Sequence, residues 1–89
     1  NVGVTNYSDQ INSAISDTGI KIVVTNTGII YKIDILANPY VSTTVFNNIG
    51  ESFLNVTYAN NGVFFASGRR SSRITVFKSS DYGDTWAEV

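Results

Sequence analysis

The chain has 89 residues and a net charge of −1, with no Cys, no His and no Met. Without Cys it has neither disulfides nor a thiolate metal site, and without His it lacks the commonest metal ligand and general base. Six basic against seven acidic side chains leave no electrostatic footprint for nucleic acid, and no apolar run approaches the ~18 residues of a membrane span. We therefore expect no metal, no cofactor, no nucleic-acid partner and no membrane span.

The first half of the chain predicts four short strands separated by turns. Val, Ile, Thr, Phe and Tyr dominate the apolar residues, which favours strands over helices. Gly19 and Gly28 each follow an Asx-Thr pair, which is typical of tight turns, and Pro39 cannot donate to a strand ladder. The strands are expected at residues 12–16, 20–25, 29–36 and 41–46.

The second half repeats this pattern. Its strands are expected at residues 54–59, 63–67, 74–78 and 85–89, with a loop over 68–72. Gly19 and Gly62 occupy matching turns 43 residues apart, and Val45 and Val89 end matching strands 44 residues apart. Four short strands at such a period are typical of a β-propeller blade, while a single eight-stranded sandwich or barrel is the alternative.

A sequence motif close to the C-terminal end favours the propeller. Residues 79–86 read Ser-Ser-Asp-Tyr-Gly-Asp-Thr-Trp and fit S-x-D-x-G-x-T-W at every fixed position. This resembles the Asp-box, or BNR repeat, of sialidases, sortilin-like receptors, some glucanases and many phage and bacterial adhesins. In those families the hairpin joins the third and fourth strands of a blade, away from the ligand face. The resemblance implies a structural role for the five matching residues, which are Ser79, Asp81, Gly83, Thr85 and Trp86.

The fold class that we expect is therefore all-β, with two four-stranded antiparallel blades of a β-propeller. A first, degenerate blade covers residues 1–46, where the matching turn reads Leu-Ala-Asn-Pro-Tyr, and a second blade with the Asp-box covers residues 47–89. Such a pair leaves one apolar face of each sheet without a neighbour, which soluble monomers avoid. We expect the missing neighbours to be copies of the chain in a head-to-tail ring, or further blades of a longer parent chain. In the second case residues 2–4, Val-Gly-Val, could serve as the strand that closes the ring.

The second half also resembles the first Asp-box blade of a sialidase, but without its catalytic residues. In that family an arginine after the second strand contacts the substrate, and Arg69 or Arg70 would match it. An aspartate acid/base follows in the same loop, whereas here residues 70–73 read Arg-Ser-Ser-Arg. The family's Arg-Ile-Pro is replaced by residues 52–55, Ser-Phe-Leu-Asn. We expect no enzyme.

Three arginines, Arg69, Arg70 and Arg73, lie close together in a chain with only 15% charged residues. In the expected blade they share one loop and can present a cationic patch to a carboxylated sugar or an acidic protein surface. The alternative is a solvated loop whose arginines pair locally with Asp81 or Asp84.

The sequence thus favours a non-enzymatic structural or recognition module, with a glycan or an acidic protein surface as the candidate ligand. A neutral surface rich in Asn, Ser and Thr suits a secreted, cell-surface or virion protein. A fragment of a sialidase-like glycoside hydrolase is the alternative, and a lectin-like ring of small subunits is a third hypothesis.

Overall fold

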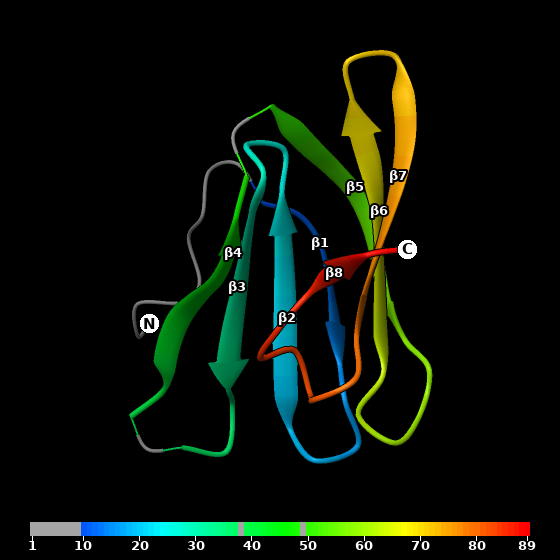
Figure 1. Cartoon of the computed structure of the whole chain (residues 1–89). Helices are drawn as coiled ribbons and strands as arrows, with labels where there is room; N and C mark the ends of the chain where they lie inside the picture. Colours follow the sequence, from blue (N-terminus) through cyan, green and yellow to red (C-terminus); the bar gives the residue numbers. More distant parts are fainter. Residues whose placement is uncertain (1–9, 38, 49) are drawn as a thin grey trace.

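The chain forms two four-stranded antiparallel sheets, each a meander in which successive strands are neighbours (Figure 1). The computed structural model describes residues 10–37, 39–48 and 50–89. Residues 2–4, the expected closing strand, lie outside this part. The first sheet contains β1 (Gln10–Ile15), β2 (Ile20–Thr25), β3 (Ile29–Asp34) and β4 (Val41–Asn47). The second sheet contains β5 (Glu51–Tyr58), β6 (Phe64–Arg70), β7 (Arg73–Ser79) and β8 (Ala87–Glu88). The two sheets do not close into a ring.

The expected all-β class and the two groups of four strands are confirmed, but several strand ends differ. β3 stops at Asp34, two residues earlier than expected, because the Asp34 carboxylate accepts a hydrogen bond from the Leu36 N–H at 3.1 Å and the chain turns. β8 is shorter than expected because Asp81 holds Thr85 in the preceding turn.

The loop expected over residues 68–72 is wrong. β6 continues to Arg70 and β7 begins at Arg73, and these two residues are paired across the hairpin. Only Ser71 and Ser72 form the turn, with Ser71 at a φ of 59°. A two-residue turn of this kind keeps the ladder paired to its end.

In each of three turns, a buried Ser or Thr hydroxyl accepts a backbone N–H of the turn. Ser16 Oγ accepts the Ile20 N–H at 3.1 Å, Thr25 Oγ1 accepts the Ile29 N–H at 3.0 Å, and Ser79 Oγ accepts the Gly83 N–H at 2.8 Å. All three hydroxyl residues are buried. The chain therefore ends three strands with the same local device, a side-chain oxygen that receives the free amide of the turn.

The main core lies between the sheets. It contains buried residues of both sheets, namely Ile22, Val24, Ile30, Phe53, Val56, Phe64, Ala66 and Phe77. β1 and β2 of the first sheet lie against β5 of the second. Phe46 of β4 contacts Phe53 edge-to-face and Phe77 at a tilt, with ring centroids 5.9 and 5.0 Å apart, and so adds to this core. Burial of these side chains is the main force that holds the sheets together.

The first hairpins of the two sheets have the same register when one is shifted by 43 residues. Asn12 pairs with Val24 and Asn55 pairs with Ser67, and each first strand carries a β-bulge directly before its asparagine. A bulge at the same place in both repeats gives both first strands the same local bend. The repeat seen in the sequence is therefore also a repeat of backbone pairing.

This shift reveals that the sheets pack front to back. Ile22 belongs to the core between the sheets, and its counterpart in the second repeat is Phe65. Phe64 and Ala66 belong to that core, so the side chain of Phe65 between them points to the far side of the second sheet. The sheets therefore meet through non-equivalent faces, unlike the like-to-like faces of a two-fold arrangement.

The two outer faces differ in how far they are covered. On the second sheet the outer face exposes Leu54 (54%), Ile74 (73%) and Val76 (37%). On the first sheet Val23 and Ile33 point outward but are fully buried, and Tyr31 and Ile35 pack against them. The expectation of two bare faces is therefore wrong for the first sheet and holds for the second.

Candidate functional site

The turn over residues 79–86, called the Asp-box turn below because its sequence fits that pattern, is built around the carboxylate of Asp81. Its Oδ1 accepts the Thr85 N–H at 3.0 Å and the Ser79 hydroxyl at 2.8 Å, and its Oδ2 accepts the Thr85 hydroxyl at 2.6 Å. The hydrogen bonds from the hydroxyl and the N–H of Thr85 lower the pKa of Asp81 from its ordinary 3.8 to about 2. Each oxygen of this carboxylate therefore serves the turn.

The Asp-box turn also attaches the second sheet to the first. Gly83, at a φ of 89°, lies against Ile22 so closely that a Cβ would collide with Cδ1 of that side chain. Trp86 donates its indole N–H to the Gly83 carbonyl at 2.9 Å and packs against the core. Asp84 forms an ion pair with Lys32 of β3. In Figure 1 this turn, just before β8, passes over β2.

The three arginines are not one cluster. Arg70 and Arg73 lie on the face of the second sheet that turns towards the first, and both donate to the carboxylate of Glu88, at 2.7 and 2.9 Å. Arg69 is exposed, and strand alternation places it on the opposite face. The ion-pair partners are Glu88 and Glu51, so the prediction of local pairing with Asp81 or Asp84 is wrong.

Glu51 is a fully buried carboxylate that the sequence did not single out. Its Oε2 accepts a hydrogen bond from the buried Thr75 hydroxyl, and its Oε1 lies 3.4 Å from Arg70 Nε without a hydrogen bond. Glu88 binds Arg70 from the other side, and the hydrogen bond from that guanidinium lowers the pKa of Glu88. The signal in the sequence was the position of Glu51 two residues before Phe53, on the buried face of the strand.

An open groove lies at the tip of the β6–β7 hairpin. It has a volume of about 390 Å³ and is lined by Arg70, Ser71, Ser72 and Arg73. The two guanidinium groups face two carboxylates, Glu51 and Glu88, so the tip carries no excess positive charge. Its binding capacity for an anion is therefore weaker than the three arginines of the sequence indicate.

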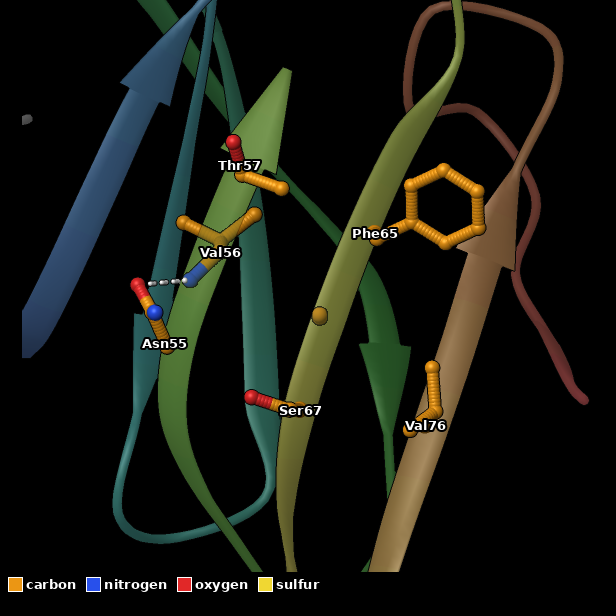
Figure 2. Close-up of a pocket in the computed structure, with 7 residues that line it drawn as sticks. Asn55, Val56, Thr57, Phe65, Ser67 and Val76 are labelled. Carbon is orange, nitrogen blue, oxygen red and sulfur yellow. Dashed lines mark hydrogen bonds between the residues drawn. The ribbon is translucent and has the colours of Figure 1, made fainter. Parts of the chain in front are cut away.

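The outer face of the second sheet exposes apolar side chains, among them Leu54, Ile74 and Val76. Figure 2 shows Phe65 and Val76 on adjacent strands of this face, with Asn55 and Thr57 on β5 beside them. The depression here holds about 80 Å³, well below the ~300 Å³ at which small-molecule pockets begin. Lys78 lies over the Phe65 ring at 5.9 Å. The face therefore suits another sheet better than a small ligand.

Each carboxylate in the described part of the chain is engaged by another group. Those in the Asp-box and in the arginine pairs are described above, Asp17 accepts the Tyr58 hydroxyl at 2.7 Å, and Asp34 accepts the Leu36 N–H. Within the same residues no group of three or more carboxylates is placed to hold a metal ion. The described residues form no helix that is long and apolar enough to cross a membrane.

Comparisons with known proteins found no matching family model, no curated protein and no solved structure similar to this chain.

Proposed function

We propose that the chain is a non-enzymatic structural or recognition module of a secreted, cell-surface or virion protein, built as two blades of a β-propeller. The observation that carries this proposal is the front-to-back packing of the two repeats. Contacts between non-equivalent faces leave the outer face of the second sheet without a partner until further units close a ring. Such a stack is completed only by further blades.

The exposed apolar face of the second sheet supports the same proposal. Phe65 and Val76 occupy the places that Ile22 and Ile30 occupy in the first sheet, since Ile30 pairs with Val24 and Val76 pairs with Ser67. Ile22 and Ile30 are fully buried against the second sheet. Their counterparts are the residues that a third sheet would cover.

The engaged carboxylates support a module without catalytic activity. Glycoside hydrolysis by the usual mechanism needs a pair of carboxyl groups, one on each side of the bond that is cleaved. Here Asp81 serves a turn, while Glu51 and Glu88 serve arginines. Each of these three carboxylates is therefore held in a contact that stabilises the fold.

A glycosidase assay tests this part of the proposal. The folded chain, incubated with a panel of fluorogenic aryl glycosides that includes a sialoside, is expected to release no more fluorophore than buffer. Turnover that disappears in the Glu51→Gln variant would contradict the proposal, because Glu51 is the one fully buried carboxylate of the described residues.

The groove at the β6–β7 tip favours a second candidate function, recognition of a glycan or an acidic protein surface. Its volume of about 390 Å³ falls in the size range of ligand sites, and two serine hydroxyls accompany the two guanidinium groups. A glycan array probed with the chain and with the Arg73→Ala variant tests it. Binding that is unchanged in the variant rules this groove out as the site.

A further inference from the structure

Lys32 in the first sheet and Lys78 in the second occupy equivalent positions. Lys32 pairs with Ile22 across β2 and β3, and Lys78 pairs with Phe65 across β6 and β7. Ile22 and Phe65 are themselves counterparts in the two repeats. Because the sheets pack front to back, Lys32 lies on the face that the second sheet covers, and Lys78 lies beside Phe65 on the outer face. The outer face therefore repeats the lysine of the internal interface.

Within the chain, the sheet that covers Lys32 also neutralises its charge. Asp84, in the Asp-box turn of the second sheet, forms an ion pair with Lys32. Lys78 has no carboxylate partner among the described residues, and its ammonium group lies 5.9 Å from the centroid of the Phe65 ring. Strand alternation places the exposed Arg69 on the same face, where none of the described residues is acidic. The outer face is therefore cationic and lacks the acidic partner that the internal interface has.

The asparagines that follow the two β-bulges point to the same arrangement. Asn12 donates from Nδ2 to Oδ1 of Asn55 at 3.1 Å, which joins the first strands of the two sheets. Asn55 is exposed, and its own Nδ2 donates to no acceptor among the described residues. The outer face thus carries two polar groups, at Lys78 and Asn55, whose counterparts in the first sheet are satisfied by the neighbouring sheet.

The first sheet of a second copy does not fit this place. In the second sheet Val56 and Phe64 belong to the core between the sheets, whereas the corresponding residues of the first sheet are Ser13 and Lys21. The turn that corresponds to the Asp-box, residues 36–40, reads Leu-Ala-Asn-Pro-Tyr and has no carboxylate. The second sheet of another copy has the right residues, but its own first sheet already covers them. The missing neighbour is therefore not a copy of this chain.

We infer that the outer face of β5–β7 binds a further β-sheet that is not a copy of this chain, and that a turn of that sheet places a carboxylate on Lys78. The partner sheet offers an apolar face to Phe65 and Val76 and a hydrogen-bond acceptor to Asn55. The inference rests on the proposed function and names the chemistry of the partner. The contact continues the interface already present inside the chain, and opposite charges at the turn fix how the sheets align.

The second repeat has all of these features, so residues 47–89 made as a separate polypeptide serve as the probe. This fragment is mixed with the full chain, and association is measured by sedimentation velocity. We expect a complex of one chain with one fragment. Lys78→Glu in the chain is expected to weaken association at least about tenfold, because it opposes Asp84 of the fragment with a like charge. Asp84→Lys in the fragment is expected to restore association to within about threefold of the wild-type pair.

Lys21→Glu is the matched control, since it makes the same change of charge on the outer face of the first sheet and is expected to leave association unchanged. If the fragment only displaced the chain's own second sheet, Asp84 of the fragment would meet Lys32, and Lys78→Glu would have no effect. That result would overturn the inference and leave the proposed function standing. Self-assembly of the chain without fragment, abolished by Lys78→Glu, would do the same, because copies would then cover the face.

A fragment that does not fold alone is tested in a fused form, with residues 47–89 joined to Val89 of the full chain. Lys78→Glu is expected to lower the urea midpoint of the fused chain and to leave that of the 89-residue chain unchanged. Failure of the fragment to dock in both forms would contradict the inference and the blade stacking of the proposed function together. Glycosidase turnover would contradict the proposed function alone, so the two failures are distinguishable.

Discussion

The backbone of Gly83, in the Asp-box turn, lies directly against the side chain of Ile22 in the centre of the first sheet. A motif that is local in sequence is thus also a contact between the two repeats. The turn needs glycine here for two reasons, the φ of 89° and the absence of space for a Cβ. Comparing Gly83→Ala with a glycine that has only the positive φ distinguishes these two effects.

Gly83→Ala is expected to lower the free energy of unfolding by about 2 kcal/mol, because it combines an unfavourable backbone angle with an overpacked core. Gly50→Ala is the matched control, since Gly50 also has a positive φ, of 98°, but no atom lies within 4 Å of the added methyl group. Urea denaturation measures both. Equal losses in the two variants would show that the contact with Ile22 adds nothing.

Asp81 gives the fold an acid-sensitive component. Its pKa is about 2 in the folded chain and near the ordinary 3.8 when unfolded, so the unfolded state takes up the proton first. The stabilisation is fully present above about pH 4 and is lost as the pH falls towards 2. Asp81→Asn is expected to be less stable at neutral pH, on the order of 1 kcal/mol, and to lose this acid step.

Thermal unfolding followed from about pH 6 to pH 2 checks this prediction. Thr85→Val removes the main donor to Asp81 and is expected to raise the pKa of Asp81 and shrink the acid step without abolishing it. An acid step of the same size in the wild-type chain and in Asp81→Asn would assign it to another carboxylate.

Glu51 is expected to matter for stability far more than Glu88, although both pair with Arg70. Glu51→Ala leaves the buried Thr75 hydroxyl without its acceptor and opens a cavity, and is expected to cost about 3 kcal/mol. Glu51→Gln keeps an acceptor for Thr75 and is expected to cost less. Glu88→Gln, on the surface, is the control with a small effect. Guanidinium denaturation that ranks Glu88→Gln with Glu51→Ala would refute the prediction.

A substitution on the outer face of the second sheet is expected to change association without changing the stability of the fold. Val76→Lys changes a partly exposed side chain, so the free energy of unfolding of the monomer should change by less than about 0.5 kcal/mol while association is lost. Phe77→Ala, one residue further on the buried face, is expected to cost about 3–5 kcal/mol. Sedimentation velocity and urea denaturation of both variants check this. A Val76→Lys variant that associates like the wild-type chain would exclude this face.

Local features of the fold were predictable from the sequence. Strand composition and glycine turns define eight strands, and the Asp-box spacing identifies a hairpin in which Asp81 serves Thr85, as observed. The site was not predictable to the same extent, because its contacts join residues far apart in the chain. Lys32 and Asp84 are 52 positions apart, and Thr75 and Glu51 are 24 apart.

The three arginines show why such contacts are hard to predict from the sequence. Adjacent arginines look alike in a sequence, but a strand sends neighbouring side chains to opposite faces. β6 extends through Arg69 and Arg70, so Arg69 is exposed on the outer face and Arg70 pairs with Glu51 and Glu88. Only the position of the hairpin turn, at Ser71 and Ser72, decides between a loop and this arrangement.

Front-to-back packing also bears on how the two repeats have diverged. A position that faces the interior in one repeat faces outward in the other, as Ile22 and Phe65 or Val24 and Ser67 do. Descendants of a duplicated unit would therefore come under different selection at most positions. The two halves carry the same residue where its structural role is the same, at Asn12 and Asn55 after the bulge and at Gly19 and Gly62 in a turn with positive φ. Low sequence identity between the halves is therefore compatible with a repeat of the same backbone pairing.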